Sequence, residues 1–424
     1  RQLQNIVPTL ARQLAGQSRS FAEAVADVDP MILYKSSEHV EKLLVTPWKQ
    51  SMKDRRDELP PSLIVIDALD EIENNGGEQL LRELIDSIRG EGVQGLKILV
   101  TSRPHPDIVD ATNSLPRDTI FHLEDIKDKD GTEDIRTFLA ARLPKLYVSP
   151  SRVHRQGLEE LVNLASGLFI FAATAARLIS PLNRERSLTE QADGLSKIIL
   201  SPADGGSTSA VDALYNRVLD DAIPQQDRPS RLRILHTVVS ALQPLTVATL
   251  AELVAVDSKN KDEEAAELCI GALHSVLYVR DKRVYIYHKS FSDFILDQQR
   301  CSPELACSPS TQNTHLFRTC LRIMGASLRF NMCSLPSSYN FDSEVGDLKQ
   351  AVQKNILDVL GLEYACRYWT SHLIKVPASS GDSLLLSALE EFGQEKVLFW
   401  IEVMNLLAAR RECLDGANAV KNWV

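Results

Sequence analysis

Three things are scarce in this sequence of 424 residues, and each scarcity excludes a class of protein. No apolar run reaches the roughly 20 residues of a membrane span. The longest run, Leu168 to Ala176, is much shorter and is followed by Arg177. Basic residues are outnumbered, with 47 Lys and Arg against 57 Asp and Glu and a net charge of −10. We therefore expect no membrane span and no broad nucleic-acid surface, since that surface needs concentrated positive charge.

Cysteine is missing from the first half of the chain, and no signal peptide is visible. The seven cysteines all lie in the second half, their number is odd, and no two of them form a CxxC pair. This pattern disfavours both a disulfide framework and a zinc site. It favours a reduced, cytoplasmic protein.

The strongest local pattern is an apolar run, Leu63 to Ile66, that ends in acidic residues. Such a run predicts a strand buried on both faces of a parallel sheet. Asp67 then lies at the carboxyl end of the strand, where open α/β sheets bind ligands, and Asp70 and Glu71 follow. Three carboxylates so close repel one another, which predicts a divalent metal carrying phosphates, or water, around them.

A second apolar strand, 97–101, follows a helix with one apolar face at 80–88. Strand, helix and strand at this spacing predict a βαβ unit with parallel neighbours, and a shorter strand is predicted at 120–123. The second strand ends in Thr101, Ser102 and Arg103, which should lie beside Asp67. Arg103 either contacts a terminal phosphate or pairs with Asp70 or Glu71.

From Asp134 onward the apolar spacing is helical. A helix that is apolar almost all round begins at Leu168, so it should be buried. Gly167 and Leu168 before it form either a packing turn or a ligand contact. Residues 201–209 have the composition of a linker.

Three predicted helices, at 231–242, 246–254 and 265–273, precede two short strands at 276–279 and 284–288. This is the outline of a winged-helix domain. Alternation along the second strand predicts that His288 points inward, and Ser290 is expected to cap the next helix. The rest of the chain is predicted to be helical, with a core built on aromatic residues: Trp369, Phe392, Phe399 and Trp400.

Four motifs together resemble the NACHT-type nucleotide switch proteins of the STAND class, in particular fungal members of the nephrocystin-like, heterokaryon-incompatibility type. Residues 63–71 resemble their Walker B motif, 97–104 their sensor-1 strand, 167–173 the helix after the nucleotide module, and 287–294 their winged-helix motif. Residues 364–369 are similar to the segment that precedes WD-repeats in that family.

The resemblance implies a fold and a domain order. The expected fold class is an α/β parallel-sheet domain, an incomplete P-loop NTPase, followed by mostly α regions that include a winged helix. The expected domains are a partial NACHT domain, a helical domain, a winged-helix domain and a C-terminal helical region, at 1–126, 127–225, 226–300 and 301–424.

The resemblance also implies roles for single residues. Asp67 would hold Mg²⁺, usually through water, and Asp70 and Glu71 would polarise the attacking water. Arg103 would sense the γ-phosphate of ATP (or GTP), Leu168 would contact the nucleotide, and His288 would lock the ADP-bound state. Without the resemblance, a core histidine is the favoured interpretation of His288, because a lone inward histidine is usually part of the packing.

The chain departs from the family in one motif. A P-loop needs GxxxxGK[ST], whose glycines and lysine hold the phosphates, and this sequence contains no Gly-Lys pair. In the family that motif lies upstream of the segment similar to 1–14, so we expect it to be truncated or lost. The chain should bind ATP poorly and hydrolyse it negligibly.

The sequence thus predicts a fragment of a signalling NTPase that forms homo-oligomers on nucleotide exchange and meets protein partners through further effector and repeat domains. A nucleotide-free scaffold that retains the fold is the alternative, and a P-loop encoded upstream of Arg1 would separate the two. A DNA-binding winged helix is disfavoured by the acidic stretch Glu263 to Glu267. A metal-dependent phosphoesterase using the three acidic residues lacks histidine ligands at useful spacing.

Overall fold

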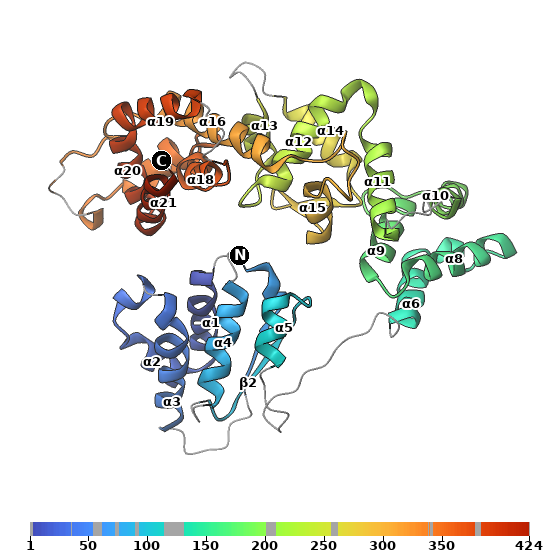
Figure 1. Ribbon diagram of the computed structural model, residues 1–424, viewed down its shortest axis with the longest axis horizontal. Coiled ribbons are helices and arrows are strands. Elements are labelled where there is room, and N and C mark those ends of the chain that lie inside the picture. Colours follow the sequence, from blue (N-terminus) through green and yellow to red (C-terminus); the bar gives the residue numbers. More distant parts are fainter. Residues whose placement is uncertain are drawn as a thin grey trace. The chain divides into compact units, whose positions relative to one another are not determined.

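The computed structural model describes residues 3–34, 36–53, 62–72, 76–89, 93–113, 131–200, 209–255, 262–337, 339, 342–377 and 383–423. The chain divides into two compact units, Arg1–Asp125 and Ile126–Val424, which are described separately (Figure 1). The predicted strand at 120–123 and residues 201–208 of the predicted linker lie outside the described residues. The predicted division into four domains stays a prediction.

The first unit combines a parallel pair of strands with helices. Its α-helices are α1 Leu3–Gln17, α2 Arg19–Ala26, α3 Thr46–Lys53, α4 Gly76–Arg89 and α5 Pro106–Asn113. Its short 3-10 and π helices are η1 Pro30–Tyr34, η2 Ser36–Glu38, η3 Val40–Val45 and η4 Leu69–Glu71. Its strands are β1 Ser62–Ile66 and β2 Leu96–Val100.

The two strands pair in parallel, from Ser62 beside Leu96 to Ile66 beside Val100. Helix α4 connects them, so the predicted βαβ unit is confirmed. The amino end of α4 packs tightly against η4, since a Cβ on Gly77 would lie 2.4 Å from the Leu69 carbonyl oxygen. The loop that carries the acidic residues is therefore held against the start of a helix.

The prediction that the strand at 63–66 is buried on both faces is wrong. Ile64 and Ile66 face the core that α1, η3, α3 and α4 supply, whereas Leu63 and Val65 are 59% and 53% exposed. On β2, Leu99 is likewise 52% exposed. In the described part of this unit, helices pack on one face of the β1–β2 pair, and apolar residues of the other face are more than half exposed although their sequence is that of a fully buried strand.

The second unit begins with helices. They are α6 Thr132–Arg142, α7 Pro144–Tyr147, α8 Arg152–Ala165, α9 Phe169–Ile179, α10 Leu188–Leu200 and α11 Ala210–Ala222. Phe171, Ala172 and Ala175 of α9 are buried, as its apolar sequence predicts. Helix α9 packs against α6, α8, α10 and α11.

A helical and hairpin segment follows. It contains η6 Gln225–Asp227, α12 Arg228–Ser240, α13 Val247–Val254, α14 Glu263–Ala272, β3 Leu277–Arg280, β4 Arg283–Ile286 and α15 Lys289–Leu296. Strands β3 and β4 form an antiparallel hairpin, and its two turn residues, Asp281 and Lys282, both have positive φ. Thr246 caps α13 through its side chain, as predicted. The backbone of Val284 also donates to Leu245 O at 2.8 Å, which ties the hairpin to the start of α13.

The chain ends in a further helical region. Its elements are α16 Pro309–Ser327, η7 Asp342–Glu344, α17 Leu348–Val352, η8 Gln353–Leu357, α18 Leu362–Leu373, α19 Ser383–Glu395, α20 Val397–Leu406 and α21 Arg410–Trp423. Trp369, Phe392 and Trp400 are buried in mutual contact, with ring centroids 5.0 to 6.5 Å apart, and Phe399 is partly buried beside this core. One hydrophobic core runs through the described part of the second unit.

The seven cysteines are free thiols, and six of them are buried. Within the described ranges, no helix has the length and apolar character needed to cross a bilayer.

Candidate functional site

The carboxyl ends of β1 and β2 bring Asp67 and Thr101 together. The register that pairs Ile66 with Val100 makes them the next residues on each strand. Thr101 Oγ1 donates to Asp67 Oδ1 at 2.5 Å and accepts the backbone N–H of Ala68 at 3.0 Å. The second bond accompanies a left-handed backbone at Ala68, with φ of 55°. Thr101 thus orients the exposed carboxylate of Asp67 at the edge of the sheet.

Asp70 and Arg103 form a second link across the same edge. Asp70 Oδ1 accepts the backbone N–H of Arg103 at 3.1 Å, and Oδ2 lies 3.7 Å from the guanidinium Nε. The Asp70 side chain is only 9% exposed, whereas that of Arg103 is 48% exposed. This is the pairing that the second interpretation of Arg103 describes, and it gives Asp70 a structural contact beside any catalytic role.

The three acidic residues differ in their contacts. Asp67 is exposed and turned to Thr101, Asp70 is turned to Arg103, and Glu71 lies in η4. Among the residues that the structure describes, no group of three His, Cys, Asp or Glu side chains could hold a metal ion. Asp67 and Asp70 contact different residues of the segment that follows β2, and the prediction that a metal or water surrounds the three carboxylates stays a prediction.

A single carboxylate is enough for a magnesium ion whose other ligands are water and phosphate. Mg²⁺ usually keeps several waters and is bound through one or two carboxylates plus substrate phosphates. Asp67 is an exposed, oriented carboxylate at the carboxyl edge of a parallel sheet. It suits an ion held mainly by water and phosphate.

Leu168 and His288 belong to the second unit, and the other predicted site residues belong to the first. Leu168 is the N-cap of α9 and is 38% exposed, after a turn in which Ser166 and Gly167 have positive φ. Its backbone N–H donates to Ala165 O at 2.7 Å. It is a helix-start residue with an apolar side chain at the surface.

His288 differs from its prediction in two ways. It lies beyond β4 and is exposed, so the inward orientation and the core-histidine interpretation are wrong. It is also His288, not Ser290, that caps α15, since His288 Nδ1 accepts the backbone N–H of Ser290 at 3.1 Å. Strand β4 ends at Ile286, so the alternation of inward and outward side chains does not extend to His288.

The sequence analysis places Thr101 beside Asp67 but assigns it no role at the site. The signal for that role was its place as the first polar residue after β2, next to the Ile66–Val100 pair, where a hydroxyl can reach the Asp67 carboxylate. A β-branched residue in a strand context is easily counted with the strand, and its hydroxyl is then overlooked.

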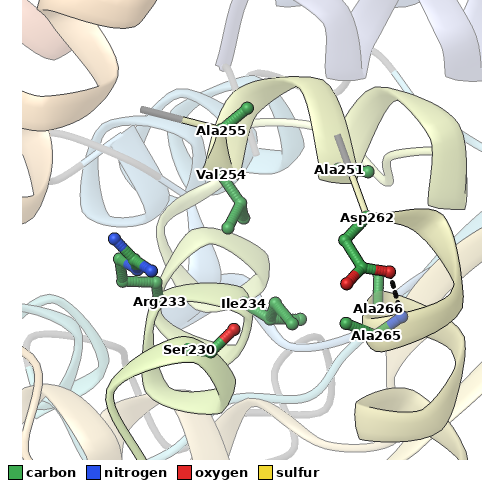
Figure 2. A pocket seen from close by; sticks show the side chains of 9 residues that line it. All are labelled: Ser230, Arg233, Ile234, Ala251, Val254, Ala255, Asp262, Ala265 and Ala266. Atoms are coloured by element: carbon green, nitrogen blue, oxygen red, sulfur yellow. Dashed lines mark hydrogen bonds between the residues drawn. The ribbon is translucent and has the colours of Figure 1, made fainter. Parts of the chain in front are cut away.

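A small hollow between α12, α13 and α14 contains none of the predicted site residues (Figure 2). Its volume is about 200 Å³, and alanine and other aliphatic side chains make up most of its wall. Asp262 at its rim accepts the backbone N–H of Ala265 at 2.8 Å, so this carboxylate already caps α14. The hollow is small for a nucleotide, because ligand pockets are usually about 300 Å³ or more.

An acidic strand end, an arginine after the adjacent strand and a histidine after a hairpin are the features expected of NACHT-type proteins. Comparison with known proteins supports that class. Residues 1–103 match the family model described as "Nephrocystin 3, N-terminal".

Among curated proteins, the chain is similar to "Vegetative incompatibility protein HET-E-1" of Podospora anserina. The two are 25% identical over 388 residues, which is 84% of this chain and 26% of that protein. The predicted resemblance to fungal NACHT-type proteins of the nephrocystin-like, heterokaryon-incompatibility type is thus confirmed. The chain spans about a quarter of the length of this relative. No solved structure matches the chain significantly.

Proposed function

We propose that the chain is part of a NACHT-type signalling protein of the vegetative-incompatibility kind, in which bound nucleotide controls oligomerisation. The observation that carries this proposal is the edge of the first unit, where Thr101 orients the Asp67 carboxylate beside the Asp70–Arg103 pair. The similarity to HET-E-1, whose name refers to vegetative incompatibility, supports the same conclusion.

Each site residue has a role in this proposal. Asp67 would hold Mg²⁺, which would neutralise charge on the phosphates of ATP or ADP. Arg103, now paired with Asp70, would exchange that partner for the γ-phosphate, and Glu71 with Asp70 would orient the attacking water. His288 would donate to a phosphate oxygen in the ADP-bound state, and Leu168 would contact the nucleotide.

The segment from α12 to β4 is proposed to be a winged helix that moves as the nucleotide changes. Three helices followed by a hairpin tied to α13 support this proposal. DNA binding is a poor alternative for it. Glu263, Glu264 and Glu267 are exposed on α14, where they would repel phosphates.

The test is hydrogen-exchange mass spectrometry of the chain with millimolar Mg-ADP, with ADP and EDTA, and with Mg²⁺ and adenosine. We expect Mg-ADP alone to protect the segments around 67–71 and 101–103, and Asp67→Ala to remove that protection. Thr112→Ala is the matched control, since the Thr112 hydroxyl donates to Val109 O within its own helix, and it should leave the protection unchanged.

Two results would change the conclusion. If millimolar Mg-ADP protects no segment of the wild-type chain, the nucleotide-free scaffold is the better description. Tight stoichiometric ADP in purified protein would instead contradict the expected weak binding of a chain without GxxxxGK[ST].

A further inference from the structure

A row of hydrogen-bonded side chains leads from the core of the second unit to the exposed ring of His288. The Tyr215 hydroxyl lies 2.8 Å from Ser290 Oγ, and this Oγ lies 2.7 Å from His288 Nδ1. Ser290 and His288 are at the start of α15, whereas Tyr215 is on α11, 75 residues before Ser290 in sequence. A helix distant in sequence therefore contacts the group that holds the histidine.

Tyr215 is held in place by the side chains packed around it. It is buried, and its ring lies 5.1 Å from that of Phe291 and 5.4 Å from that of Phe294, centroid to centroid. One turn earlier on α11, Asp212 is held by two bonds from Arg300, at 2.6 and 3.1 Å. Burial raises the pKa of Tyr215, so its hydroxyl is protonated at neutral pH and can donate to Ser290 Oγ.

The contacts of Nδ1 select one tautomer of the neutral ring. The backbone N–H of Ser290 can only donate, and it points at Nδ1 from 3.1 Å. Nδ1 therefore accepts and carries no proton, and the proton of the neutral ring lies on Nε2. If Tyr215 donates to Ser290 Oγ, the hydroxyl proton of Ser290 is directed to Nδ1 as a second donor.

We infer that Tyr215 and Ser290 are positioning residues for His288. They fix the ring at the start of α15 and keep its proton on Nε2, so that the exposed histidine presents an N–H donor to an anionic phosphate oxygen. The identity of the ligand as a nucleotide phosphate rests on the proposed function, whereas the state of the ring does not. The two parts are measured separately.

The ring is measured without nucleotide, through the two imidazole nitrogen shifts of His288 in ¹⁵N-labelled protein at about pH 8. The His288→Gln spectrum assigns the signals. We expect the wild-type ring to be almost entirely in the Nε2–H form, less so in Ser290→Ala, and intermediate in Tyr215→Phe. Ser290→Thr, which retains the hydroxyl, should restore the wild-type ratio. Tyr368→Phe removes a hydroxyl from α18 in the same unit and should change nothing at His288.

Nitrogen shifts of His288 that are the same in wild type, Ser290→Ala and Tyr215→Phe would overturn the inference, whatever the protein binds. The second measurement adds millimolar Mg-ADP. We expect the Nε2 signal of the wild type to move, and the affinity to fall about 3- to 10-fold in Tyr215→Phe, which is the worth of one hydrogen bond.

The two failures can be told apart. If the tautomer responds to the variants but Mg-ADP moves no His288 signal, the proposed function fails and the positioning of the ring stands. If Mg-ADP binds equally well to wild type and Tyr215→Phe while their tautomer ratios are equal, the nucleotide proposal stands and the positioning role is wrong.

Discussion

Two histidines of the second unit occupy opposite environments and show how differently one residue type can be used. His288 is exposed at a strand–helix junction, where its Nδ1 caps α15. His372 on α18 is fully buried between Tyr364 Oη, 2.9 Å from its Nε2, and Asn313 Oδ1, 2.8 Å from its Nδ1. Nδ1 of His288 accepts a backbone N–H at the protein surface, whereas both nitrogens of His372 are bonded to side chains inside the core.

The environment of His372 makes it a structural residue. Tyr364 Oη also accepts the backbone N–H of Leu242 at 3.3 Å, and Asn313 Nδ2 donates to Pro309 O at 2.7 Å. The ring therefore joins α18 to α16 and to the segment after α12. Burial lowers the pKa of His372 to about 3, so the ring is neutral in the folded protein.

The largest expected effect comes from His372→Ala. The change opens a cavity, leaves the hydroxyl proton of Tyr364 without its acceptor and removes the ring N–H from Asn313 Oδ1, so the free energy of unfolding should fall by about 3 kcal/mol or more. His288→Ala is the matched control. It removes a helix cap and should cost about 1 kcal/mol. Urea unfolding followed by circular dichroism measures both, and equal losses would refute the contrast between the two sites.

The sequence pattern of alternating inward and outward residues could not distinguish these two histidines. It predicted an inward His288 because β4 was extended two residues too far, and nothing around His372 marked it as important. Its partners lie 8 and 59 residues away in sequence. The general expectation that a lone histidine is part of the core holds for His372 and fails for His288. Only the tertiary contacts show which of the two is buried.

The next largest effect concerns pH. The pKa of His372 is about 3 in the folded chain and near 6.5 in the unfolded one, so between these values the unfolded chain binds one more proton. Stability should therefore fall as the pH drops below 6.5, by about 2 kcal/mol for this residue between pH 7.5 and 5. His236 and His315, whose pKa values burial also lowers, act in the same direction.

His372→Gln isolates the contribution of His372 to the pH dependence of stability, because glutamine does not titrate. Urea unfolding at pH 7.5 and pH 5 should show a smaller loss of stability in the variant than in the wild type. The same loss in both proteins would mean that the ring is protonated in the folded state, and the buried network would then need a different description.

Much of the first unit could be predicted from sequence, because its strands and the helix between them follow from residues that are close together in the chain. The run from Leu63 to Glu71 and the spacing to β2 were enough for the parallel pair and its acidic edge. The exposure of Leu63, Val65 and Leu99 could not be predicted, since it depends on which elements pack on the second face of the sheet. The division of the acidic residues between Thr101 and Arg103 likewise depends on contacts between side chains 33 or 34 positions apart.

The smallest effect is expected for asparagine in place of the exposed histidine. Asparagine is among the best N-cap residues, so His288→Asn should keep α15 capped and change the free energy of unfolding by less than about 0.5 kcal/mol. His372→Asn makes the same replacement in the core, where the shorter side chain cannot bridge Tyr364 and Asn313, and it should cost about 2 kcal/mol or more. Urea unfolding and hydrogen exchange of the peptides that cover α15 and α18 measure the pair. A large loss for His288→Asn would show that its ring supports the fold beyond the cap, and His288 would then be a structural residue like His372.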